Sequence, residues 1–185
     1  MTERADAARN RAKVLDAAAR LFADRGAANV TMEDIARAAG VGRGTLYRRY
    51  PDRASIAVAL LDEHERALQE QLLRGQAPLG PGAAPAQRLA AFYRAMVDLL
   101  EQHVHLALGA EVGQSRFATG AYGFWRAHVG SLLRAAGAPE ALTDSLLAPL
   151  APDVYDYQRR DRGLTPQAIG DALAVLAERV LTGER

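Results

Sequence analysis

The segment RGTLYRRYPDR, residues 43–53, brings hydroxyl and guanidinium groups close together and contains a single carboxylate, Asp52. Arginine side chains neutralise phosphates and make binding depend on salt, and one arginine can donate two hydrogen bonds to a guanine edge. Threonine and tyrosine hydroxyls donate to phosphate oxygens without adding charge. These residue types favour a nucleic acid as the partner. The groups concerned are Arg43, Thr45, Tyr47, Arg48, Arg49 and Arg53.

Two short helices must hold these groups in place. Thr31 is a predicted N-cap with Asp34 at the capping-box position, and Gly40 ends the helix that they begin. A second short helix is expected from Gly42 to about Tyr47. A helix, a glycine turn and a short basic helix form a helix-turn-helix pattern, whose second helix enters the major groove. The same residues would also fit an ordinary helical hairpin with a solvated basic face.

The charge of the chain is unevenly distributed. Residues 1–53 contain 11 Lys or Arg and 7 Asp or Glu, a balance of +4, whereas residues 54–185 contain 12 and 15, a balance of −3. A basic end on a mildly acidic body favours a polyanion bound at that end. The absence of cysteine excludes disulfides, thiol catalysis and thiolate metal sites. No apolar run predicts a membrane span, and no signal-peptide pattern is present. A cytoplasmic protein that binds no membrane is therefore expected.

The rest of the chain also shows helical periodicity, and no segment predicts a strand. The expected fold is all-α, with about nine helices: a three-helix helix-turn-helix domain over residues 1–53 and a second helical domain over residues 86–185. A helix over about residues 53–74 connects them. Residues 75–85, GQAPLGPGAAP, contain three prolines and three glycines and are the clearest linker. Short helical pieces, broken at Gly109 and Gly113, are expected over residues 104–118.

The segment TxEDIAxxAGVxxGTLYxxYxDR, residues 31–53, resembles the DNA-binding signature of the tetracycline-repressor (TetR) family of bacterial regulators. The preceding helix, AAxxLFxxxG over residues 17–26, is also similar. The specific match covers roughly residues 10–60. Further along the chain only the layout is similar, with a linker followed by an all-helical ligand-binding and dimerisation domain. Arg49, Tyr50 and Arg53 stand where the family often has His, Phe and Lys, which leaves the operator sequence open.

The resemblance implies a role for individual residues. Arg43, Gly44 and Tyr47 would face bases, while Ile35 and Leu46 would belong to the core. Phosphate contacts would come from Thr31, Thr45, Tyr47, Arg49 and Arg53, and Arg48 joins them by its charge.

The second domain contains fewer signals. Aromatic and apolar residues at helical spacing either line a ligand pocket or are simply core: Phe92, Met96, Leu99, His103, Tyr122, Trp125 and His128. Apolar residues near the C-terminus either form a dimer interface or pack on their own chain: Val154, Tyr157, Ile169, Leu173, Leu176 and Val180. His103 and His105 do not share a helix face, so no metal site is expected.

These observations together predict a regulator of transcription, of the repressor type, that binds a palindromic double-stranded operator as a homodimer. In bacterial cytoplasm it would associate with the nucleoid when bound. An unidentified small-molecule effector would release it, and no cofactor is expected. A ligand-independent architectural DNA-binding protein is a second hypothesis. An enzyme that uses the C-terminal helical domain is a third, but the sequence contains no zincin pair, phosphate loop, Cys–His pair or nucleophile elbow.

Overall fold

The computed structural model describes residues 2–26, 29–110 and 120–183. Within them the chain forms nine α-helices and no strand, so the predicted all-α fold is confirmed. The helices divide between two compact units, Met1–Asp62 and Glu63–Arg185. The division falls inside α4 (Arg53–Arg74). The domain boundaries and the linker over residues 75–85 given above stay a prediction.

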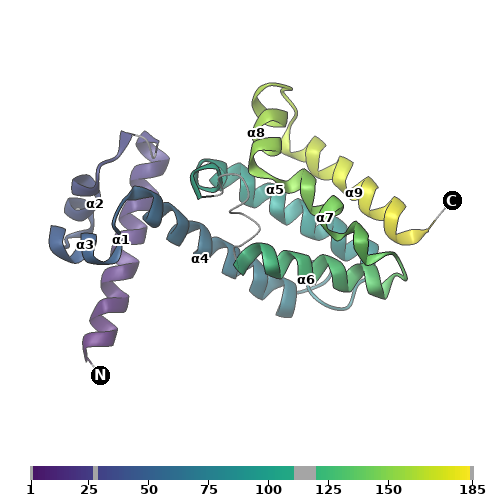
Figure 1. The fold of residues 1–185 in the computed structure, drawn as a ribbon, viewed down its shortest axis with the longest axis horizontal. Coiled ribbons are helices and arrows are strands. Elements are labelled where there is room, and N and C mark those ends of the chain that lie inside the picture. Colours follow the sequence, from purple (N-terminus) through teal and green to yellow (C-terminus); the bar gives the residue numbers. More distant parts are fainter. Residues whose placement is uncertain (1, 27–28, 111–119, 184–185) are drawn as a thin grey trace. The chain divides into compact units, whose positions relative to one another are not determined.

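The first unit contains α1 (Thr2–Arg25), α2 (Met32–Ala39), α3 (Arg43–Arg49) and the beginning of α4 (Figure 1). Helix α1 packs against α2, and α2 packs against α3. The core of this unit is aliphatic and aromatic, and both Ile35 and Leu46 are buried in it, as expected. Its other buried side chains include Val14, Leu15, Phe22, Val30, Tyr50, Ile56 and Leu60.

Local capping residues determine where α2 begins and ends. The Thr31 hydroxyl accepts a hydrogen bond from the Asp34 N–H at 3.1 Å, and the Thr31 N–H donates to the Asp34 carboxylate at 3.1 Å. This is the predicted capping box. The hydrogen bond from the Thr31 side chain holds the pKa of the Asp34 carboxyl below its usual value. Gly40 ends the helix with a φ of 64°, a left-handed conformation that glycine adopts without strain.

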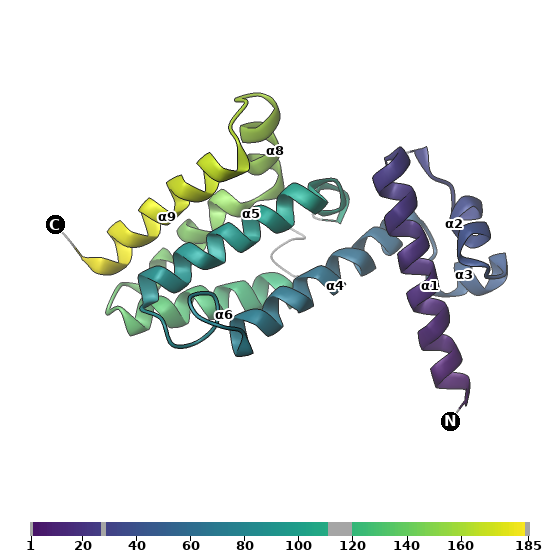
Figure 2. The same ribbon diagram turned by 180° about the vertical axis from the view of Figure 1, so that it is seen from behind.

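The second unit surrounds α5 (Pro85–Ala110) with α6 (Gly120–Ala135), α7 (Thr143–Leu147), α8 (Pro152–Arg160) and α9 (Pro166–Thr182). Two short 3-10 turns, Glu140–Leu142 and Ala148–Leu150, flank α7. Helices α5 and α9 lie side by side, as both views show (Figures 1 and 2). Phe92 and Tyr93 on α5 are fully buried, and the Tyr93 hydroxyl donates to the Leu146 carbonyl at 2.9 Å. The buried phenol therefore has a partner, as a buried polar group requires.

Helix α5 departs from regular geometry at one residue. His103 has φ −133° and ψ 15°, and the helix continues beyond it to Ala110. Residues 104–110 form a short helical piece after this kink, as expected, but the predicted break at Gly109 is wrong, because Gly109 lies within that piece. Gly113 lies outside the described residues. At the irregular position the His103 ring stacks on the His64 ring of α4, with centroids 3.8 Å apart.

Two absences hold for the described residues. None of the helices there combines the length and the apolar character that crossing a bilayer requires. No group of three or more His, Asp or Glu side chains in the same residues could hold a metal ion.

A carboxylate on α5 joins this helix to α8 and to the loop that follows α8. Glu101 accepts from the Tyr155 hydroxyl at 2.6 Å and from Arg159 Nε and Nη2 at 2.8 and 2.7 Å. Arg159 Nη1 also donates to the Leu164 carbonyl at 2.8 Å. The hydrogen bonds from Arg159, followed by that from Tyr155, lower the pKa of Glu101 to about 2.

This shift predicts an acid-sensitive contribution to stability. A carboxyl whose folded pKa is depressed stabilises the fold above its unfolded pKa of 4.5, and this stabilisation is lost as the pH falls toward about 2. We expect Glu101→Gln to reduce the proton uptake on unfolding by up to about one proton between pH 4.5 and 2. Urea unfolding followed by circular dichroism at several pH values measures this. Glu178→Gln, at an exposed position of α9, is the control, and an equal effect of both variants would contradict the expectation.

Candidate DNA-binding site

The third helix exposes nearly all of its side chains. Of the seven residues of α3, only Leu46 is buried. Its positive side chains point to solvent at positions 43, 48 and 49, and the Tyr47 side chain between them is 42% exposed. A helix held by one buried residue presents the rest of its circumference for contact with a partner.

The first turn of α3 contains Arg43 and Gly44. Arg43 Nη2 forms an ion pair with Glu33 Oε1 of α2, and the Arg43 side chain remains 69% exposed. A pair so exposed contributes little to stability, so a stronger partner can displace the carboxylate. Gly44 is exposed, and a Cβ placed on it would meet no atom within 4 Å. The space beside the helix backbone is therefore open.

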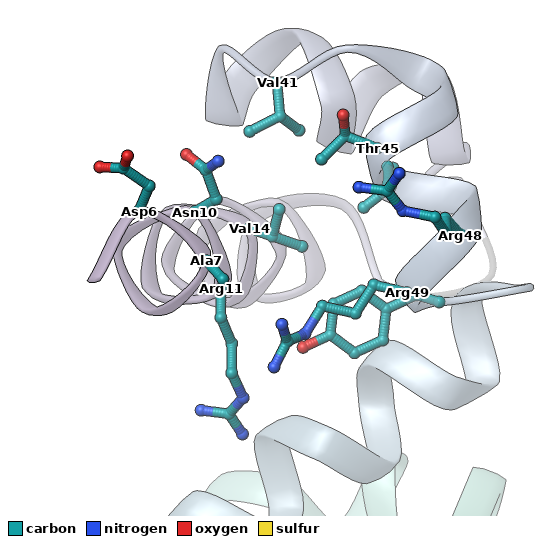
Figure 3. Close-up of a pocket in the computed structure, with 11 residues that line it drawn as sticks. Asp6, Ala7, Asn10, Arg11, Val14, Val41, Thr45, Arg48 and Arg49 are labelled. Atoms are coloured by element: carbon teal, nitrogen blue, oxygen red, sulfur yellow. The ribbon is translucent and has the colours of Figure 1, made fainter. Parts of the chain in front are cut away.

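The last turn of α3 carries two arginines on the side that faces α1. Figure 3 shows Arg48 and Arg49 extending from α3 toward α1, with the Thr45 hydroxyl on the same side. Neither arginine forms a hydrogen bond or an ion pair with any residue that the structure describes. These two guanidinium groups are therefore available to an external anion.

Two residues predicted to contact phosphates also have a structural role. Thr31 is exposed but serves as the N-cap of α2. Arg53 Nη1 donates to the Val30 carbonyl at 2.9 Å, which ties the start of α4 to the segment before α2. Replacing either residue would therefore lower the stability of the unit as well as change its surface.

One helix contributes side chains that the sequence analysis did not single out. Asn10 and Arg11 of α1 line the same pocket as Arg49. The only signal for them in the sequence was the basic character of the N-terminal residues. Because their positions depend on how α1 packs against the other two helices, that signal could not assign them to a site.

The proposed ligand-pocket residues separate into three places in the second unit. Phe92 lies 5.7 Å from Trp125 and 5.3 Å from His128, measured between ring centroids, and forms one aromatic cluster with them. His103 instead stacks on His64, and the Tyr122 hydroxyl donates to Asp144 at 3.0 Å. Met96 is buried and Leu99 is half-buried.

A pocket of about 310 Å³ lies next to this aromatic cluster. His128 lines it together with Leu72, Arg88 and Phe124. The Nε2 atom of His128 and the Nε atom of Arg88 are both buried and make no hydrogen bond within the described residues. Burial, followed by the nearby charge of Arg88, lowers the pKa of His128 to about 4. The imidazole is therefore neutral near pH 7.

The residues proposed for a dimer interface differ in burial. Ile169 and Leu173 are buried, because α9 packs along α5 of its own chain. Val154, Tyr157 and Leu176 are exposed and Val180 is half-buried. An additional exposed apolar residue, Val175, is 56% exposed on α9.

Comparison with known proteins places the first unit in a family. Residues 14–60 match the family model of bacterial regulatory proteins, tetR family. The HTH-type transcriptional regulator TtgR of Pseudomonas putida is 44% identical over 61 residues, which make up 32% of this chain and 29% of that protein. The matched segment thus spans less than a third of this curated relative.

Solved structures extend the likeness in fold to nearly the whole chain. A putative transcriptional regulator from Saccharomonospora viridis, solved with choline, has a TM-score of 0.69 at 20% identity and covers 91% of this chain and 95% of its own. The regulator FadR from Bacillus subtilis, solved with stearoyl-CoA, has a TM-score of 0.65 at 16% identity, covering 94% and 98%. At these identities the likeness shows the fold alone. The match over residues 14–60 places the first unit in the tetR family of bacterial regulatory proteins.

Proposed function

We propose that this protein is a DNA-binding regulator that represses transcription, binds a palindromic operator as a homodimer and is released by a small-molecule ligand. The observation that carries the proposal is the exposed face of α3, where Arg48 and Arg49 have no partner within the described residues and Arg43 has only an exposed one. Such a helix suits the major groove, with its N-terminal residues near base edges. The match over residues 14–60 supports the same reading.

The first prediction separates base reading from phosphate binding. Arg43→Ala should weaken binding to a duplex obtained by in vitro selection by about 1–3 kcal/mol and relax the preference at one base pair in each half-site. Arg48→Ala should weaken selected and random duplexes alike and flatten the salt dependence by about one unit of slope. Fluorescence anisotropy over a salt series measures both effects.

Arg134→Ala is the control, because Arg134 forms an exposed ion pair with Glu140 in the second unit. Equal losses on both duplexes for Arg43→Ala would argue against base reading. If the wild-type chain bound selected and random duplexes equally, the proposal that it is a sequence-specific regulator of transcription would be wrong.

A ligand site in the second unit is supported by the pocket beside His128. Ligand pockets are mostly apolar with a few polar groups that fix orientation. Here Leu72 and Phe124 supply apolar surface, and the unpaired Nε atom of Arg88 can donate a hydrogen bond. A neutral His128 adds a second polar atom without charge. We infer a ligand with an apolar body and an acceptor group placed near Arg88.

Trp125 allows this part of the proposal to be tested. It is the only tryptophan, it is buried, and its ring lies in the same cluster as Phe92 and His128. A compound that releases the protein from DNA should therefore change the tryptophan emission, and His128→Phe should weaken that response. Stearoyl-CoA and choline are suitable first compounds, because the two structural neighbours described above were solved with them. Release from DNA with an unchanged emission would place the ligand elsewhere.

A homodimer is supported by the exposed apolar residues of α8 and α9, together with the need for two reading helices to specify an operator. Tyr157, Val175 and Leu176 leave apolar surface uncovered in a single chain. Leu173, by contrast, is buried in its own chain, so a charge there would damage the fold rather than test the interface.

The test therefore charges only exposed positions. Tyr157→Glu combined with Leu176→Glu should dissociate the dimer and abolish operator binding while the helix content stays unchanged, because neither side chain belongs to the core. Sedimentation velocity at micromolar concentration and circular dichroism measure this. Val58→Glu, at an exposed apolar position of α4, is the matched control. A double variant that stays dimeric would show that the interface lies elsewhere.

A further inference from the structure

The first unit contains a pocket that DNA reading by α3 does not explain. It lies between α1 and α3 and has a volume of about 470 Å³. Val14 of α1 and Leu46 of α3 are buried residues that form its apolar floor, and Val41 lies opposite Val14 in Figure 3. A DNA backbone is convex and polar, so it does not fill an apolar recess of this size. Pockets of this volume are typical of small-molecule sites.

The polar wall of this pocket is strongly basic. Arg11 comes from α1, and Arg48 and Arg49 come from α3 (Figure 3). The one carboxylate in the lining, Asp6, forms an ion pair with Arg9. An anion that binds among guanidinium groups forms charge-assisted hydrogen bonds with them.

We propose that this pocket binds a small amphipathic anion, with an apolar aromatic or acyl body on the Val14–Val41–Leu46 floor and a phosphate, sulfonate or carboxylate head between Arg11 and Arg49. A ligand there would occupy Arg48 and Arg49, which the proposed function assigns to DNA phosphates. Its binding would therefore exclude DNA directly at the reading helix. Only this second step rests on the proposed function, since the pocket exists without DNA.

The probe that tests the pocket is 1-naphthyl phosphate, added to the full chain with labelled valine and leucine methyl groups. Binding should shift the methyl resonances of Val14, Val41 and Leu46 in NMR spectra. Inorganic phosphate has no apolar body and 1-naphthol has no charge. Each should therefore bind at least about tenfold more weakly than 1-naphthyl phosphate. If inorganic phosphate bound as strongly as 1-naphthyl phosphate, the apolar floor would contribute nothing to binding. The site would then be an ordinary phosphate contact for DNA, and the proposal would be overturned. Shifts confined to other methyl groups would overturn it as well.

Two variants test the charged wall. Arg11→Gln and Arg49→Gln should each weaken naphthyl phosphate about tenfold, as expected for the loss of a charge-assisted hydrogen bond. Arg37→Gln is the matched control, because Arg37 is exposed on α2 of the same unit and does not line the pocket. If Arg11→Gln bound the probe as tightly as the wild type, Arg11 of α1 would not contribute to the site.

Competition between duplex DNA and 1-naphthyl phosphate tests the exclusion step. Saturating duplex DNA should displace naphthyl phosphate from the wild-type chain. Simultaneous binding of both would overturn the exclusion step. A wild-type chain that binds the probe but no duplex would instead refute the proposed function, so the two failures are distinguishable.

Discussion

The geometry of the first unit depends on the burial of one leucine. Leu46 is the only buried residue of α3, and a seven-residue helix is too short to be stable in water on its own. Its position follows from that contact and from the turn before it, where Gly40 adopts a left-handed conformation. Because so few groups hold the helix, most of its side chains are left for a partner. A recess lies between α3 and α1, and Val14, Val41 and Leu46 supply apolar surface to it.

The second unit is held together by more extensive contacts than the first. Helix α5 lies against α9 along its length, and Glu101 joins it to α8 through three hydrogen bonds. Two residues beyond Glu101, the helix loses regular geometry at His103. The part of α5 before that point is thus firmly packed, and the stacked imidazoles of His64 and His103 mark where α4 touches its irregular part. The pocket beside His128 lies among helices α4, α5 and α6 of this unit.

Sequence reasoning predicted best what neighbouring residues determine. Thr31, Asp34 and Gly40 act over a few residues, so the limits of α2 could be read from them, and the burial of Ile35 and Leu46 followed from the periodicity and from the family resemblance. Contacts distant in the sequence could not be found in this way. Glu101 and Arg159 are 58 residues apart, and nothing near either residue indicates the other. The same holds for Arg11, whose place in one pocket with Arg49 depends on helix packing, and for Leu173, whose stripe of apolar residues fitted a dimer interface as well as its own core.

The arginines of α3 have one more consequence. The four histidines of the chain are His64, His103, His105 and His128, and all of them lie in the unit Glu63–Arg185. The titratable side chains of the unit Met1–Asp62 are carboxylates, arginines, tyrosines and Lys13, with no histidine among them. Arg49 stands where the family often has a histidine, so even that position keeps a permanent charge. The attraction of this unit for a polyanion therefore comes from guanidinium groups and Lys13 rather than from imidazoles, the side chains that most readily change charge between pH 5 and 8.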